Sequence, residues 1–249
     1  MELIITKDID EMSREFATWM SDLIQLTLKK KKSFSLVLSG GTTPQKLFQL
    51  LATKKYRKKI EWDRIQIFWG DERVVDFSDN RNNAKMAFDN FLSIVPVKKD
   101  QVHIIDTTKT PDTAAEEYEK LLRQFFPGTG ETFDLVILGL GDNAHTLSLF
   151  PGYEVVLEKK HWVRAFYLEE QKMYRVTLTA PVINAARNIV FLVSGPAKAP
   201  ALQHVLEDTY DPWRNPAQVI RPERGRLFWW VDEAAAQNLT NTNMSFSTI

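Results

Sequence analysis

The sequence contains no cysteine. Disulfide bonds, a thiolate nucleophile and cysteine-metal sites are therefore excluded. A lack of disulfides is typical of proteins from reducing compartments, and we expect a cytoplasmic protein. The first ten residues also lack the basic and then apolar pattern of a secretory signal, which agrees with this expectation.

The sequence also lacks an excess of charge of either sign, because 32 lysines and arginines balance 32 aspartates and glutamates. A general nucleic-acid binder carries a basic excess, so no nucleic-acid partner is predicted. Two lysine-rich runs, 29–32 and 54–59, fall where helices are expected to end or turn. We interpret them as solvated faces rather than as a phosphate-binding surface.

Long apolar runs are absent too. No uninterrupted run approaches the roughly 20 residues that a membrane span requires, so we predict no membrane partner. Only four histidines occur, and none has a partner at the spacing of a metal site. We therefore predict neither a metal ion nor a metal-dependent reaction.

What the sequence does contain is a regular alternation of two apolar patterns. Short runs rich in branched and aromatic residues predict strands at 3–6, 34–38, 65–69, from 133, and at 162–166, 174–178, 188–193 and 227–231. Amphipathic segments between them predict helices at 9–26, 83–92 and 113–126, one that ends near 206, and a final helix capped by Asp232. The loosest stretches are 210–226 and the tail after Leu239.

This alternation predicts an α/β fold, a doubly wound, mostly parallel sheet with helices on both faces. A chain of 249 residues with 44% hydrophobic residues suits one such unit, so a single domain over 1–249 is expected. In an open parallel sheet, ligands bind beyond the carboxyl ends of the strands. Four loops that leave predicted strands carry glycine or polar residues: 39–43, 71–73, 139–146 and 194–198.

The first of these loops has the chemistry of an anion site. Gly40 and Gly41 let the backbone approach a ligand closely, and Thr42 and Thr43 add hydroxyl groups at the start of a helix. Thr43 is expected to cap that helix, with Pro44 in its first position. A tight turn that binds nothing explains the loop equally well. It is not a P-loop, because the glycine spacing and the lysine are missing.

The loop Asp71-Glu72-Arg73 places three charges after an apolar strand. Taken alone, it is best explained as a solvated strand end with an internal ion pair. Beside an anion-binding loop, Arg73 becomes a fork-shaped clamp for a phosphate or carboxylate.

The third loop, Gly139 to Thr146, presents His145 directly after a buried strand. Its glycines match the permissive dinucleotide fingerprint, but Pro151-Gly152 stops the long helix that this fingerprint needs, so we reject that interpretation. A lone histidine is more often structural than catalytic, yet this position is where α/β enzymes place chemistry.

Taken together and in order, these segments resemble the glucosamine-6-phosphate isomerase/6-phosphogluconolactonase family. The resemblance is carried by blocks spread over nearly the whole chain: Leu38-Ser-Gly-Gly-Thr-Thr-Pro44, Trp69-Gly-Asp-Glu-Arg73, Asn83, the segment from Gly139 to Pro151, Arg175-Val-Thr-Leu-Thr, Ser194-Gly-Pro-Ala-Lys198, and Asn215-Pro-Ala with Trp230-Val-Asp232. It implies a Rossmann-like fold.

Two features are similar to the lactonase branch of the family. His145 is followed by Thr-Leu-Ser-Leu-Phe-Pro, whereas the deaminases have a sequence that ends in Asn-Glu-Pro. The second block reads Asp-Glu-Arg rather than Asp-Glu-Tyr. One feature departs, because lactonases usually read Asp-Gly-His where this chain has Asn143-Ala144-His145. A neutral amide orients the ring without stabilising an imidazolium, and Asp142 is expected to point elsewhere.

The resemblance implies hydrolysis of 6-phosphoglucono-δ-lactone to 6-phosphogluconate in the oxidative pentose phosphate pathway, without metal or organic cofactor. His145 is then the expected base, with Asn143 and Arg73 as further catalytic residues. The developing oxyanion is assigned to the Gly40-Gly41 turn, the Gly141 turn or Arg73. Expected substrate-binding residues are Gly40, Gly41, Thr42, Thr43, Asp71, Asn83, Gly141, Arg175 and Lys198.

Two alternatives stay open at this point. One is a glucosamine-6-phosphate deaminase or isomerase, against which the sequence after His145 speaks. The other is a catalytically silent sugar-phosphate-binding protein, which only the Asn143-Ala144 departure favours. The expected assembly is a monomer or a homodimer.

Overall fold

The computed structural model describes residues 1–128 and 130–240. Its centre is a seven-stranded sheet in which each neighbouring pair of strands is parallel. Across the sheet the strands lie in the order β1 (Glu2–Thr6), β10 (Arg226–Asp232), β9 (Asn188–Val193), β6 (Leu135–Leu138), β2 (Phe34–Leu38), β3 (Ile65–Trp69) and β5 (Val102–His103). Except for β5, these strands lie close to the predicted positions, and the central ones are short apolar runs buried on both faces. The sequence did not predict β5, a strand of two half-buried residues.

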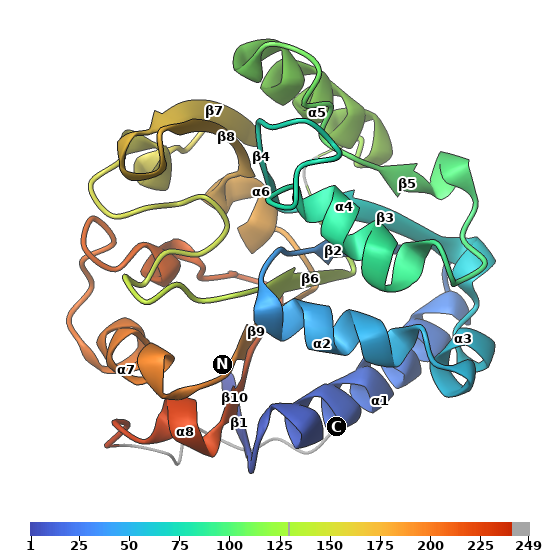
Figure 1. The fold of residues 1–249 in the computed structure, drawn as a ribbon, viewed down its shortest axis with the longest axis horizontal. Coiled ribbons are helices and arrows are strands. Elements are labelled where there is room, and N and C mark those ends of the chain that lie inside the picture. Colours follow the sequence, from blue (N-terminus) through green and yellow to red (C-terminus); the bar gives the residue numbers. More distant parts are fainter. Residues whose placement is uncertain (129, 241–249) are drawn as a thin grey trace.

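Helices cover both faces of this sheet (Figure 1). One layer contains α1 (Ile9–Leu28), α2 (Thr42–Leu51), α3 (Lys54–Lys59) and α4 (Asn83–Ala87). A π-helical turn (Phe88–Leu92) continues α4. The other layer contains α5 (Pro111–Phe125), α6 (Ala180–Asn184), α7 (Ala199–Glu207) and α8 (Glu233–Ala236). The predicted doubly wound α/β fold is confirmed. Asp232 caps α8 as predicted, because its side chain accepts a hydrogen bond from the backbone N–H of Ala235.

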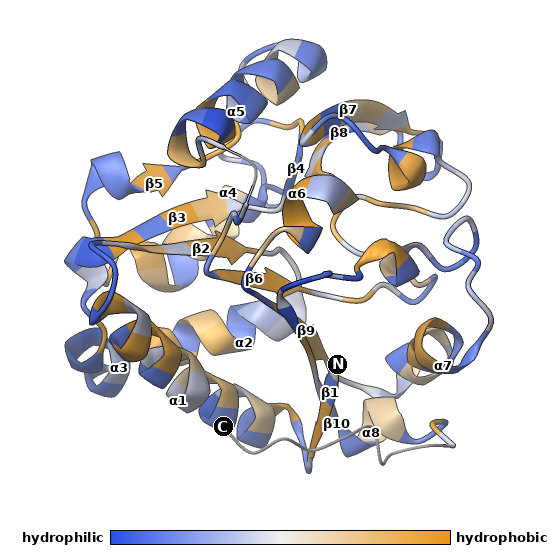
Figure 2. Ribbon diagram, turned by 180° about the vertical axis from the view of Figure 1, so that it is seen from behind, coloured by the Kyte–Doolittle hydropathy of each residue, from blue (hydrophilic) through white to orange (hydrophobic). Residues whose placement is uncertain are grey.

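Successive residues of a central strand pack into opposite layers, because side chains alternate across a strand. Trp230 points toward α1, where its ring centroid lies 5.7 Å from that of Phe16. Trp229 points the other way and stacks on Phe191 at 3.9 Å. The hydropathy colouring shows the result, with apolar strands inside and helices that turn their polar sides outward (Figure 2).

A second, antiparallel sheet of three strands lies beside the carboxyl ends of β2 and β3, and the sequence did not predict it as a separate sheet. It consists of β4 (Asp71–Arg73), β8 (Met173–Leu178) and β7 (Val163–Leu168). The prediction of a loop at 71–73 was therefore wrong. After Gly70 the chain leaves the large sheet and pairs with β8, a long-range partner that local sequence does not reveal.

The predicted start of α2 was also wrong. Gly41, not Thr43, occupies the position before the helix, so Pro44 lies in the third helical position. Gly41 has φ 107°, a left-handed conformation that turns the chain sharply and lets the helix begin at Thr42. No side chain caps this end, so the first N–H groups of α2 stay available to a ligand.

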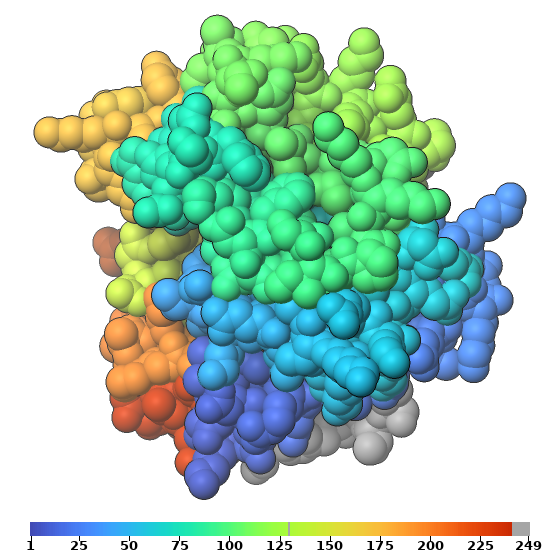
Figure 3. Space-filling view, turned by 45° about the vertical axis from the view of Figure 1, so that its right-hand side comes forward, coloured from blue at the N-terminus to red at the C-terminus, as the bar shows by residue number. Residues whose placement is uncertain are grey.

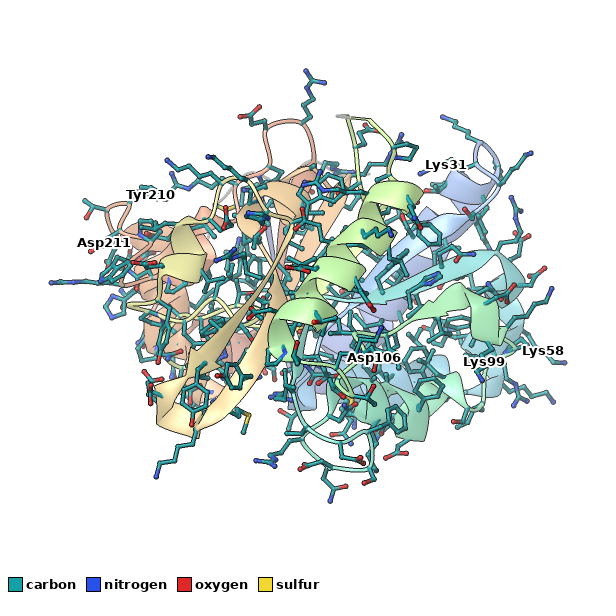
Figure 4. The ribbon with its side chains drawn as sticks, turned by 90° about the horizontal axis from the view of Figure 1, so that it is seen from above. Lys31, Lys58, Lys99, Asp106, Tyr210 and Asp211 are labelled. Atoms are coloured by element: carbon teal, nitrogen blue, oxygen red, sulfur yellow. The ribbon has the colours of Figure 1, made fainter. Side chains whose placement is uncertain are left out.

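The outer surface agrees with the interpretation of the lysine runs. Seen space-filled, α2, α3 and the segment that follows β4 form one outer face (Figure 3). The side chains of Lys31 and Lys58 lie at the rim of the molecule (Figure 4). None of the described helices has the length and apolarity to cross a membrane. The tail after Leu239, predicted to be loose, lies almost entirely outside the described residues.

Candidate active site

A cleft of about 240 Å³ opens at the carboxyl edge of the large sheet. All four loops singled out in the sequence line it, although one of them proves to be strand β4. Their contributions come from β2, β3, β6 and β9, whose carboxyl ends meet at one edge because the strands are parallel. The cleft is lined by every predicted site residue except Asn143: Gly40, Gly41, Thr42, Thr43, Asp71, Arg73, Asn83, Gly141, His145, Arg175 and Lys198.

Asn143 is exposed and does not line the cleft, but it orients the imidazole of His145. Its Oδ1 is 2.5 Å from Nδ1 of His145 and also accepts the backbone N–H of that residue at 3.3 Å. A carboxamide oxygen only accepts, so Nδ1 carries the proton. The other ring nitrogen, Nε2, is then the one with a free lone pair.

The His145 ring packs closely against two groups. An added Cβ on Gly141 would fall 2.0 Å from Nδ1 of His145, so the ring approaches this backbone as only glycine allows. Phe150 stacks on the imidazole, with centroids 4.1 Å apart and an interplanar angle of 16°. Sequence reasoning missed Phe150, whose only signal was its place in the segment that follows the histidine.

The surroundings of His145 keep the imidazole neutral. Burial is the largest cause, and it lowers the pKa of His145 to about 4. The positive charges of Lys198, Arg175 and Arg73 act in the same direction, while Asp71 opposes them. An uncharged imidazole at neutral pH can accept a proton, which is what a general base requires.

The glycine-rich loop is fitted to Asn83. A Cβ on Gly40 would fall 1.9 Å from Oδ1 of Asn83, so only glycine allows this contact. The Asn83 side chain then connects two other site residues. Its Oδ1 accepts from Nη1 of Arg73 at 2.5 Å, and its Nδ2 donates to the carbonyl oxygen of Asp71 at 2.9 Å.

Glu72 underlies this arrangement, and sequence reasoning did not assign it a role. The side chain is 1% exposed, and its carboxylate accepts three backbone N–H groups, from Arg73 at 2.9 Å, Asn83 at 2.7 Å and Ala84 at 2.8 Å. Burial raises the pKa of Glu72 to about 7 against the effect of these bonds. An internal ion pair at a solvated strand end, the alternative for this segment, is wrong because Asp71 and Glu72 are both buried.

Two further cations line the cleft. Arg175 is 3% exposed, and its Nη1 lies 3.8 Å from Oδ2 of Asp71. Burial lowers the pKa of Arg175 to about 10. Lys198 donates from Nζ to Oδ1 of Asp142 at 2.5 Å, so this carboxylate pairs with Lys198, while the imidazole of His145 bonds to Asn143 instead. With Arg73, these cations give the cleft a positive charge that suits a phosphate.

One donor among the possible holders of an oxyanion, the backbone N–H of Gly141 itself, is already in use. The N–H of Gly141 already donates to the carbonyl oxygen of His145 at 2.8 Å. The Gly40-Gly41 turn and Arg73 remain. Among the described residues, no cluster of three or more histidine, aspartate or glutamate side chains is arranged to hold a metal ion.

The sequence matches the family described as "Glucosamine-6-phosphate isomerases/6-phosphogluconolactonase" over residues 7–229. A probable 6-phosphogluconolactonase 2 of Oryza sativa subsp. indica is 32% identical, and the match covers 97% of this chain and 91% of the relative. A 6-phosphogluconolactonase of Nostoc sp. is 35% identical, with 87% and 89% covered.

A solved structure gives the same result in three dimensions. The 6-phosphogluconolactonase of Trypanosoma brucei superposes with a TM-score of 0.85 at 28% sequence identity, and covers 96% of this chain and 98% of its own. Family match, curated relatives and fold agree over nearly the whole length. The chain belongs to the glucosamine-6-phosphate isomerase/6-phosphogluconolactonase family.

Proposed function

We propose that the protein hydrolyses 6-phosphoglucono-δ-lactone to 6-phosphogluconate, as a step of the oxidative pentose phosphate pathway. The observation that carries this proposal is the neutral His145, oriented through Nδ1 by Asn143 in a cleft with three cations. It is the activity predicted from the sequence. The relatives named 6-phosphogluconolactonase support it, because they match over most of their length.

In the first step, water adds to the carbonyl carbon of the lactone while Nε2 of His145 takes one of its protons. The carbonyl oxygen gains negative charge, which the N–H groups of Gly40 and Gly41 or the guanidinium of Arg73 stabilise. In the second step the bond from this carbon to the ring oxygen breaks. Nε2 returns the proton to that oxygen, which leaves a carboxylic acid and an open chain.

The phosphate group anchors the substrate away from the reacting carbon. We assign it to the uncapped N-terminus of α2, with the hydroxyls of Thr42 and Thr43, and to the cations of the cleft. Fixing the remote end of the substrate holds the lactone carbon near His145, so binding energy is converted into orientation.

No observation in the cleft favours either of the two alternatives, the deaminase or the silent binder. A silent binder has no use for an imidazole that is stacked on Phe150, packed against Gly141 and hydrogen-bonded through Nδ1. A deaminase is disfavoured by the residues that follow His145, where Phe150 stacks on the imidazole.

The proposal includes action without metal or organic cofactor, in the cytoplasm, as a monomer or a homodimer. Activity that survives dialysis against a chelator supports the first point, and light scattering during gel filtration measures the assembly. Loss of activity on chelation, restored by one metal, contradicts the mechanism.

The test uses lactone generated in situ from glucose 6-phosphate near neutral pH, with the spontaneous rate subtracted. We expect the wild type to exceed background, and His145→Ala to lower kcat by about 10²–10⁴-fold with little change in KM. An unchanged kcat disproves the assignment of the base. If the wild type only matches background, ammonia release from glucosamine 6-phosphate distinguishes a deaminase from a silent binder.

A further inference from the structure

The buried guanidinium of Arg175 is incompletely satisfied. Nη1 faces Asp71 across 3.8 Å, and Nη2 donates to Oε1 of Gln171. Nε is buried and, within the described part of the chain, has no hydrogen-bond partner. A buried donor without a partner is costly, so native proteins rarely leave one unexplained.

The positions of these donors on the guanidinium show what is missing. Nε and Nη2 lie on the same edge of the planar group and form a two-pronged fork, which matches two oxygens of one carboxylate or phosphate. Gln171 offers this fork a single carboxamide oxygen. It therefore satisfies one prong and leaves the other without a partner.

Gln171 is also able to leave. It is exposed and belongs to the short turn Glu169–Gln171 that joins β7 to β8, and it lines the cleft together with Arg175. Arg175 is fixed from other directions, by Asp71 at Nη1 and by Phe150, whose ring centroid lies 5.8 Å from Cζ.

We propose that Gln171 is a placeholder for a substrate oxyanion: it occupies one prong of the Arg175 fork in the free protein and gives it up when the phosphate group binds. The inference rests on the proposed function, whose substrate carries that phosphate. It makes Gln171 a determinant of affinity, although this residue contributes nothing to the chemical step.

The test compares two substitutions with opposite expected signs, by calorimetric titration with inorganic phosphate and with 6-phosphogluconate. Gln171→Met keeps the length of the side chain but removes the acceptor, so Arg175 is no longer occupied. We expect the Kd for both ligands to fall about threefold to tenfold. Gln171→Glu supplies two carboxylate oxygens to both prongs, and we expect the Kd to rise at least tenfold, less so at high salt.

The matched control is Gln124→Met, the same substitution at an exposed position of α5, and its Kd should equal that of the wild type. If Gln171→Met binds these ligands as tightly as the wild type or more weakly, the proposal is overturned. Removal of a side chain that competes with the phosphate group for Arg175 should strengthen binding of the phosphate. Lactone hydrolysis by the wild type is measured on the same preparation. Its absence disproves the proposed function, whereas the titrations alone decide the role of Gln171.

Discussion

Ala144 stands in the turn before His145, where lactonases usually have glycine, and it has φ 62°. This left-handed conformation costs an alanine about 1–2 kcal/mol. Hydrogen bonds hold the turn in place: the N–H of Ala144 donates to the carbonyl oxygen of Gly141, and its own carbonyl oxygen accepts from Ala217, both at 3.0 Å. The departure therefore leaves the position of His145 intact at a cost in stability.

Asn143, the second departure, makes a direct prediction about pH. In Asn143→Asp a carboxylate replaces the amide oxygen that lies 2.5 Å from Nδ1. A negative charge at this distance favours the imidazolium and raises the pKa of His145 above its value of about 4. The acidic limb of kcat/KM should therefore move to higher pH by about one unit or more.

The pH profile of kcat/KM between pH 4 and 8 measures this shift, and Asn143→Ala is the control. Alanine accepts no hydrogen bond from Nδ1, so the tautomer is no longer fixed and kcat should fall at every pH. A profile of Asn143→Asp that coincides with the wild type excludes His145 as the titrating base.

At the scale of elements, β4 and the first turn of α4 act as one unit because Glu72 joins them. Through this junction Asn83 reaches Gly40 and Arg73, which are contributed by two different segments. Local propensity does not explain α4, which has only five residues. A helix this short is stabilised mainly by its tertiary contacts.

The Glu72→Gln substitution should therefore weaken binding more than the chemical step. The amide NH₂ would face a backbone N–H, which leaves a buried donor unsatisfied and costs about 1–3 kcal/mol of stability. With Asn83 and Arg73 displaced, KM should rise at least fivefold, and kcat should fall by a smaller factor if Arg73 rather than the Gly40-Gly41 turn stabilises the oxyanion. Steady-state kinetics and urea unfolding measure both effects.

Glu223→Gln, an exposed position, serves as the control for the same substitution and should be silent in both measurements. A variant at Glu72 that loses stability but keeps the wild-type KM would limit this residue to a structural role. Glu72→Asp keeps the charge but shortens the reach to the N–H groups, and it should fall between Gln and the wild type.

At the scale of the whole molecule, two site groups with shifted pKa values make opposite contributions to stability as the pH changes. The folded-state pKa of His145, about 4, lies below the ordinary 6.5, so the unfolded chain binds more protons and acidification from pH 6.5 destabilises. The pKa of Glu72, about 7, lies above the ordinary 4.5, so the folded state binds more protons and acidification from pH 7 stabilises.

Replacement of His145 by Gln removes one side of this balance. When the pH is lowered from 7 to 5, the wild type should lose about 2 kcal/mol of unfolding free energy through His145, and the variant should not. The variant is therefore expected to gain this amount relative to the wild type. Urea unfolding of both proteins at the two pH values measures this difference of differences. A difference near zero would mean that the imidazole is hydrated in the folded protein and titrates normally.

The fold was predictable from the sequence because its information is local. Runs such as 34–38, 65–69 and 188–193 became strands with the predicted bounds, since apolar residues buried on both faces of a parallel sheet leave little choice. The family, too, followed from short blocks in order, and the match over residues 7–229 confirms it. The single domain over 1–249 stays a prediction.

Only the tertiary structure decided which residues meet. Strand β4 was taken for a loop because its partner, β8, lies about a hundred residues later in the chain. The contacts of Glu72, Phe150 and Gln171 span no more than 12 residues of sequence. They were missed because they depend on how the small sheet and the His145 loop fold over the large sheet, which local patterns do not show. Short-range patterns of hydrophobicity specify each element and its buried face, whereas contacts between loops of different elements depend on the packing of the whole chain.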